Sequence, residues 1–163
     1  MTLFRPLAAL LLFAATACAT KATEPAGPDF YVMRHLQKAE GPDPGLSAEG
    51  SANAQRLIAL LGTRKLRAIY VSTTRRARET AAPLAAKLGL AAKEYDPSDT
   101  AGLIGRVAAE AGPVLVVGHS NTVPEIVERL GGDRPAPLAE TDYGDVWHLW
   151  GAPRRTVRLR VAP

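Results

Sequence analysis

The chain has 163 residues, of which 47% are hydrophobic and 22% are charged, and this suits one globular domain with a sizeable core. The formal net charge is +4 at pH 7, and only 6% of the residues are aromatic. No long basic run is interleaved with aromatic residues, so the composition argues against a nucleic-acid partner. A local site for a small anion accounts equally well for the modest basic excess.

The first residues have the pattern of an export signal. Arg5 precedes an apolar stretch, Leu7 to Ala15, which is too short to span a bilayer and has the length of a signal-peptide core. Ala15-Thr16-Ala17 is a small-residue cleavage signature. We therefore expect residues 1–17 to be a signal peptide and the protein to be exported.

The only cysteine, Cys18, directly follows this cleavage signature. The arrangement resembles a bacterial lipoprotein signal, in which the cysteine becomes the lipidated first residue, although leucine is usual where Ala15 stands. Two interpretations stay open, a lipid anchor in the outer membrane or ordinary cleavage into the periplasm, and neither allows an intramolecular disulfide. Residues 18–28 are expected to be a tether and residues 29–163 the domain.

Strands and helices are expected to alternate from the start of the domain. Phe30 to Met33 is an apolar run typical of a strand buried on both faces. A loop rich in glycine and proline, Ala39 to Leu46, leads to Ser47, which is placed to cap a helix that ends at Gly62. The apolar stripe of this helix is formed by Ala54, Leu57, Ile58 and Leu61. Ala68 to Val71 predicts the next strand.

The second half of the domain continues the alternation. A second helix is expected to begin at Thr73 or Thr74, and Pro83 is expected to kink it or to split it in two. The remaining expected segments are a short strand from Ala92 to Tyr95, a helix capped by Asp99, a strand from Val114 to Val117, a helix closed by Gly131-Gly132, and a last alternating strand from Val157 to Val161. This order predicts a three-layer α/β/α sandwich with a mostly parallel central sheet and antiparallel edge strands.

Three of the expected strands end in polar groups. Arg34-His35 follows the first, Ser72 and Arg76 follow the second, and Gly118-His119 follows the strand that begins at Val114. Parallel strands bring their carboxyl ends to one edge of the sheet, where open α/β sheets bind ligands. Two histidines and two arginines in one pocket suit a phosphoryl group, because a guanidinium matches phosphate geometry and histidine can act as a nucleophile.

The segments YVMRH, SAEG, STTRRARETA and VVGHSNT resemble the successive motifs of the histidine phosphatase superfamily, the phosphoglycerate-mutase-like or two-histidine phosphatases. The motifs follow in order from about Phe30 to Val123. The family motif of serine, three residues, arginine-alanine, two residues and threonine is fitted within STTRRARETA by Ser72, Arg76, Ala77 and Thr80. The compact size and the GHSNT segment resemble the small bacterial members, which include phosphohistidine phosphatases.

This resemblance implies a phosphoglycerate mutase-like fold and a metal-independent phosphatase that needs no cofactor and hydrolyses a phosphomonoester or a related phosphoryl substrate. His35 would be the nucleophile and become phosphohistidine during turnover. Arg34 and Arg76 would hold the phosphoryl oxygens, and His119 would complete the pocket. The expected partner is a phosphorylated small molecule or a phosphorylated component of the cell envelope.

Two features depart from the family pattern. Leu36 stands where the family has glycine or another small residue, so its side chain either narrows the entrance of the pocket or only repacks beside it. The general acid, a glutamate in many members, has three candidates here: Glu94, Asp96 and Asp99. Asp96 is favoured because it begins a polar loop after an expected strand.

Other functions are also compatible with parts of this pattern. A catalytically weak or inactive envelope lipoprotein could keep the pocket only to bind a phosphorylated ligand. Zinc ligation by His35 and His119 is disfavoured, because the neighbouring arginines would repel a divalent cation. A mutase would need long insertions to enclose its substrate, and this short chain lacks them.

Overall fold

The computed structural model describes residues 27–161. The predicted signal peptide, Cys18 and most of the predicted tether lie outside the described residues, so these remain predictions. The elements of the described part are β1 (Phe30–Arg34), α1 (Ala48–Leu61), β2 (Ala68–Ser72), α2 (Arg75–Leu88), β3 (Ala92–Tyr95), α3 (Thr100–Ala108), β4 (Val114–Gly118), α4 (Val123–Arg129), β5 (Asp145–Trp150) and β6 (Arg155–Arg160). In this part of the chain, no helix combines the length and apolar character that crossing a membrane requires.

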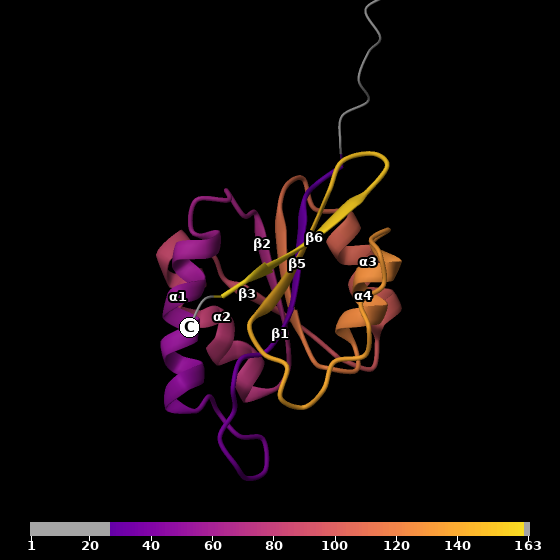
Figure 1. Ribbon diagram of the computed structural model, residues 1–163. Coiled ribbons are helices and arrows are strands. Elements are labelled where there is room, and N and C mark those ends of the chain that lie inside the picture. The colour runs from indigo at the N-terminus through magenta and orange to yellow at the C-terminus, as the bar shows by residue number, and fades with distance from the viewer. Residues whose placement is uncertain (1–26, 162–163) are drawn as a thin grey trace, which may run out of the picture.

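The six strands form one mixed sheet in the order β3-β2-β4-β1-β5-β6. The first four strands are parallel, whereas β5 runs antiparallel to β1 and β6 runs antiparallel to β5. Helices α1 and α2 cover one face of the sheet, and α3 and α4 cover the other (Figure 1). The predicted three-layer sandwich with antiparallel edge strands is therefore confirmed.

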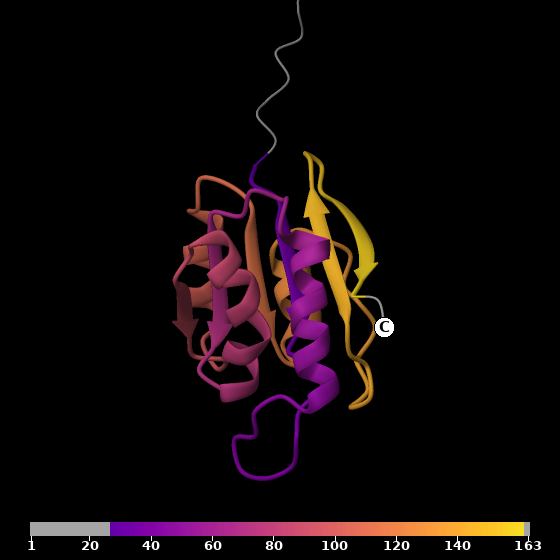
Figure 2. The same ribbon diagram turned by 90° about the vertical axis from the view of Figure 1, so that its left-hand side faces the viewer.

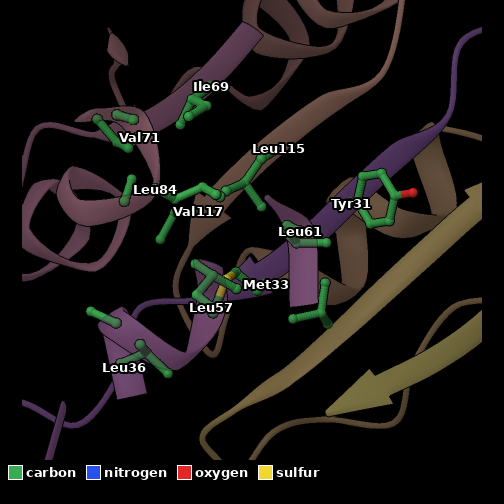
Figure 3. Close-up of a cluster of buried hydrophobic side chains, with 14 of the residues drawn as sticks. Tyr31, Met33, Leu36, Leu57, Leu61, Ile69, Val71, Leu84, Leu115 and Val117 are labelled. Atoms are coloured by element: carbon green, nitrogen blue, oxygen red, sulfur yellow. The ribbon is translucent and has the colours of Figure 1, made fainter. Parts of the chain in front are cut away.

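The central strands are buried because both of their faces are covered by helices. Every residue of β1, β2 and β4 is buried, which explains their nearly continuous apolar sequences. On β1, Met33 belongs to the core on the side of α1 and α2, while Val32 belongs to the core on the side of α3 and α4. Figure 3 shows the first of these cores, in which Met33 lies close to Leu57 of α1.

The helix boundaries follow the capping residues that the sequence offers. The Ser47 hydroxyl accepts a hydrogen bond from the Gly50 amide (3.1 Å), and an Asp99 carboxylate oxygen accepts one from the Gly102 amide (2.8 Å), so both predicted caps are confirmed. Helix α2 runs without a break through Pro83, so of the two expected outcomes, a kink or a split, the split does not occur. The buried face of the helix continues past the proline at Leu84, and this packing outweighs one lost backbone hydrogen bond.

The last strand, β6, is apolar on alternate residues but is only partly covered. Val161, just after the strand, is buried, and Leu159 packs against the core on the side of α1 and α2. Val157 is 40% exposed. The alternation of the sequence thus predicted the strand, but the core reaches only its C-terminal part.

The carboxyl ends of the parallel strands lie together at one end of the sheet, which is the lower end in Figures 1 and 2. The loop that follows β1 projects there, and the connection from α4 to β5 passes the same end. These two segments are far apart in the sequence, and they enclose the place where the predicted polar strand ends meet.

Candidate functional site

The two histidines of the predicted site follow adjacent parallel strands. Strands β1 and β4 pair with Arg34 opposite Gly118, and the His35 amide donates to the Gly118 carbonyl (2.9 Å). This register places the rings of His35 and His119 edge to face, with their centroids 5.3 Å apart. The structure therefore brings these two strand ends together as expected.

The hydrogen bonds of His35 determine which ring nitrogen is free to react. Its Nδ1 lies 2.8 Å from the carbonyl oxygen of Leu36, and since a carbonyl only accepts, Nδ1 carries the proton. Its Nε2 lies 3.0 Å from Nε of Arg76, which only donates, so Nε2 presents a lone pair. The neutral ring thus points its nucleophilic nitrogen toward the second predicted arginine.

The backbone next to His35 is fixed by α2. The Leu36 amide donates to the Thr80 hydroxyl (2.9 Å), which in turn donates to the Arg76 carbonyl (2.8 Å). The Leu36 side chain is fully buried and belongs to the core on the side of α1 and α2 (Figure 3). This residue therefore repacks the interior and does not narrow the entrance of the pocket.

His119 is fixed by its contacts on three sides. Its Nε2 lies 2.8 Å from the Ser72 hydroxyl, its Nδ1 lies 3.4 Å from Nη2 of Arg76, and its backbone amide donates to the Thr122 hydroxyl (3.0 Å). The Arg76 guanidinium consequently contacts both histidines. Its Nη1 lies 3.7 Å from a carboxylate oxygen of Asp43.

Both imidazoles are neutral at pH 7 because of where they lie. Burial, followed by the positive charge of Arg76, lowers the pKa of His119 to about 4. Burial also lowers the pKa of His35 to about 4; the Leu36 carbonyl opposes this shift, and the charges of Arg76 and Arg34 add to it. A buried neutral imidazole beside two guanidinium groups is suited to attack an electrophile that carries negative charge.

Arg34 is buried and is held by the connection between α4 and β5. Its Nη1 donates to the carbonyls of Ala139 (2.7 Å) and Asp142 (3.2 Å), and its Nη2 donates to the Glu140 carboxylate (3.0 Å). The ring of Tyr143 lies 4.2 Å from the guanidinium carbon. Its Nε is buried and has no hydrogen-bond partner within residues 27–161. The predicted phosphoryl-binding arginine is thus only partly satisfied by the protein.

These groups border a pocket of about 310 Å³ that is rich in positive charge. Its lining residues are Arg34, His35, Lys38, Thr74, Arg76, Pro97, His119, Ser120, Asn121 and Glu140. Within the described residues, no group of three or more His, Cys, Asp or Glu side chains is arranged to hold a metal ion. Four of the five predicted site residues, all except Asp96, line this one pocket.

The structure does not bring Asp96 into the lining of the pocket, although its neighbour Pro97 is there. One Asp96 oxygen accepts from the amide (2.8 Å) and the hydroxyl (2.7 Å) of Ser98, and these bonds hold its pKa below the usual value. Glu94 pairs with Arg78 (3.3 Å), and Asp99 caps α3. All three candidates for the general acid therefore form hydrogen bonds or ion pairs with residues outside the lining of the pocket.

Glu140 and Tyr143 could not be predicted from the sequence. Both lie in the connection between α4 and β5, which has no periodicity and matches no motif quoted above. Glu140 is separated from its partner Arg34 by 106 positions, so only tertiary structure brings the two together.

Comparison with known proteins supports the resemblance found in the sequence. Residues 31–98 match the sequence model of the histidine phosphatase superfamily (branch 1). This part of the chain is thus similar to that superfamily. The matched range contains Arg34-His35 and Arg76, and the family agrees with the phosphatase class of enzyme expected from the sequence. His119 lies beyond the matched range, and its place beside His35 comes from the structure.

Solved structures of this superfamily share the fold. The protein histidine phosphatase SixA, complexed with tungstate, is 17% identical with a TM-score of 0.65, and the comparison covers 82% of this chain and 97% of SixA. The SixA protein from Agrobacterium tumefaciens is 21% identical with a TM-score of 0.63, over 84% and 99% of the two chains. A mycobacterial glucosyl-3-phosphoglycerate phosphatase is 16% identical with a TM-score of 0.63, over 83% and 98%. No curated protein matches the sequence.

Proposed function

We propose that the protein hydrolyses phosphomonoesters or related phosphoryl compounds through a phosphohistidine on His35, without a metal ion. One observation carries this proposal: the Nε2 lone pair of His35 lies in a positively charged pocket, while Nδ1 is held as a donor by the Leu36 carbonyl. Because the ring is fixed and neutral before a substrate arrives, little reorganisation is needed for in-line attack on phosphorus.

The first step transfers the phosphoryl group to the protein. Phosphoryl oxygens are stronger acceptors than an imidazole nitrogen, so a bound substrate draws the Arg76 donors away from His35 Nε2. The Nε2 lone pair then bonds to phosphorus while the bond between phosphorus and the leaving oxygen breaks. Arg76 and Arg34 stabilise the charge on the transferring group, which is the main demand of a loose phosphoryl-transfer transition state, and His119 completes the pocket.

The second step releases phosphate. A water molecule attacks phosphorus, the bond between phosphorus and Nε2 breaks, and the electron pair returns to His35. The Leu36 carbonyl holds the ring through both steps, so the same nitrogen receives the phosphoryl group in the next cycle.

The substrate we propose is a phosphorylated small molecule or a phosphorylated component of the envelope. The pocket is small, and its charge favours the phosphoryl end of a substrate over the rest of it. The N-terminal sequence supports export, to the periplasm or to a lipid anchor in the outer membrane, where phosphorylated nutrients and envelope components are encountered.

The proposal is tested by turnover of p-nitrophenyl phosphate and of a phosphohistidine peptide, with and without EDTA. We expect hydrolysis that survives EDTA, is lost in His35→Ala, and yields a phosphoenzyme, trapped by an alkaline quench because phosphohistidine is labile to acid, whose phosphate is on His35. His148→Asn is the matched control, because this third histidine is held by Asp29 away from the pocket. Phosphate binding without turnover by the unmodified protein would contradict the proposal and support a binding lipoprotein.

A further inference from the structure

One carboxylic acid is positioned at the pocket without any role assigned so far. Glu140 is the only acidic side chain among the described residues that line the pocket. One of its carboxylate oxygens accepts from Nη2 of Arg34 (3.0 Å), and the other accepts from the Ser120 hydroxyl (3.1 Å). Arg34 adjoins His35, and Ser120 adjoins His119, so the acid is tied to both halves of the site.

The backbone that carries Glu140 is fixed by the same arginine. The carbonyl of Ala139, just before Glu140, and that of Asp142, two residues after it, both accept from Nη1 of Arg34. The Asp142 carboxylate closes the turn by accepting from the Ala139 amide (2.7 Å). The carboxylate is therefore held by a built turn, while 78% of its side chain remains exposed at the mouth of the pocket.

An acid at the mouth is where the reaction needs one. In-line attack by His35 Nε2 expels the leaving oxygen on the side of phosphorus away from the nucleophile. Because His35 is buried and the Glu140 side chain is exposed, we infer that this side faces the open end of the pocket. Expulsion of an alkoxide is slow unless it receives a proton in the transition state. The three acids that the sequence offered for this task, Glu94, Asp96 and Asp99, are bound to other partners outside the lining.

We propose that Glu140 gives a proton to the leaving oxygen and then takes a proton from the attacking water, an assignment that rests on the proposed function. In the first step, the bond between phosphorus and the leaving oxygen breaks, its electron pair takes the Glu140 proton, and the products are an alcohol, phosphohistidine at His35 and the Glu140 carboxylate. In the second step, this carboxylate removes a proton from water as the water oxygen bonds to phosphorus. The electron pair of the bond between phosphorus and Nε2 returns to His35, and phosphate leaves.

The charges around Glu140 make its pKa depend on whether a substrate is bound. In the free protein, the Ser120 hydroxyl and the charges of Arg34 and Lys38 hold the pKa of Glu140 below its usual value. Arg76, together with neutral His35 and His119, completes the set of titratable groups that share the pocket. A bound phosphoryl group adds negative charge beside the carboxylate and competes for Arg34, so it raises the pKa of Glu140 and favours the protonated form in the complex.

The test compares leaving groups in Glu140→Gln. Glutamine keeps an oxygen for Arg34 and polar contact with Ser120, but it has no proton to transfer. For an alkyl phosphate such as glycerol phosphate, we expect kcat/KM to fall by about 10²-fold, the usual contribution of general acid catalysis. For p-nitrophenyl phosphate, whose leaving group needs no proton, the fall should be within about threefold. The decline of kcat at alkaline pH with the alkyl substrate should also disappear.

The controls separate this assignment from its rivals. Glu128→Gln removes a carboxylate that pairs with Arg134 on the surface, and it should leave both substrates unaffected. Equal losses on the two substrates, or a lower KM on both with unchanged kcat, would overturn the assignment, the second because Glu140 would then only compete with substrate for Arg34. A leaving-group effect in Asp96→Asn and not in Glu140→Gln would overturn it in favour of Asp96. If the unmodified protein hydrolyses neither substrate in a way that depends on His35, the proposed function itself is refuted.

Discussion

At the scale of single residues, the tautomer and position of His35 depend on groups outside the lining of the pocket. The Leu36 carbonyl fixes its tautomer, and the Thr80 hydroxyl fixes the Leu36 peptide by bridging it to the first turn of α2. In the same way, Ser72 orients His119. The proposed nucleophile is thus positioned by hydrogen bonds from the end of a strand and from a helix.

Burial of two neutral histidines makes stability depend on pH. Because the pKa of His35 and of His119 is about 4 in the folded protein and near 6.5 when unfolded, the unfolded chain binds more protons between these values. We expect the free energy of unfolding to fall as pH falls from 6.5, by up to about 1.4 kcal/mol per pH unit for each histidine.

Urea denaturation at intervals between pH 7 and pH 5 measures this effect. The double variant His35→Asn, His119→Asn should show a shallower pH slope, whatever its absolute stability. An unchanged slope would mean that neither imidazole is kept neutral by the fold.

At the scale of elements, the loop between β1 and α1 is fastened to the start of α2. The Asp43 carboxylate accepts from the Arg75 amide (3.0 Å), the first residue of the helix, and lies near Arg76. The Glu79 carboxylate accepts from the Leu46 amide (2.6 Å) and from Nε of Arg75 (2.6 Å). The loop therefore supports the helix turn that presents Arg76 to the histidines.

Asp43 supplies the helix with the side-chain cap that Thr74 does not make. Its φ of 42° also favours a residue that tolerates the left-handed region. We expect Asp43→Ala to lower the free energy of unfolding by about 1–2 kcal/mol and to raise the KM for a phosphomonoester, since Arg76 loses a neighbour. Asp43→Asn keeps an acceptor and tolerates the same φ, so it should lose less than half as much stability. Equal losses in urea denaturation of the two variants would contradict the capping role.

At the scale of the whole molecule, the described residues form one sandwich (Figures 1 and 2). Residues at the carboxyl ends of its parallel strands line the pocket. The segment that the sequence assigns to export precedes β1 along the chain.

Lipidation at Cys18 is a prediction that fractionation can test. When the full chain is expressed in a bacterium that processes lipoproteins, we expect the mature protein in the membrane fraction, and Cys18→Ser should move it to the soluble fraction, because acyl chains provide the anchor. Mass spectrometry of the mature N-terminus should show the acyl groups. Soluble unmodified protein in the wild type would support ordinary signal cleavage instead.

The sequence by itself determined most of the elements, and it predicted four of the residues that line the pocket. Strands such as Phe30–Arg34 and caps such as Ser47 are specified by neighbouring residues, through apolar runs and local hydrogen bonds. His35, Arg76 and His119 could be predicted because each follows a strand, and parallel strands bring such ends together.

Only the tertiary structure decided the rest of the site. Leu36 turned into the core, Asp96 turned to Ser98, and Glu140 reached Arg34 across 106 positions of chain. The physical reason is that periodicity and capping act over a few residues, whereas the partner of a loop side chain depends on how distant segments pack. Glu140 lies in a connection that matches no motif, and its carboxylate reaches the pocket only because the α4–β5 connection packs against Arg34.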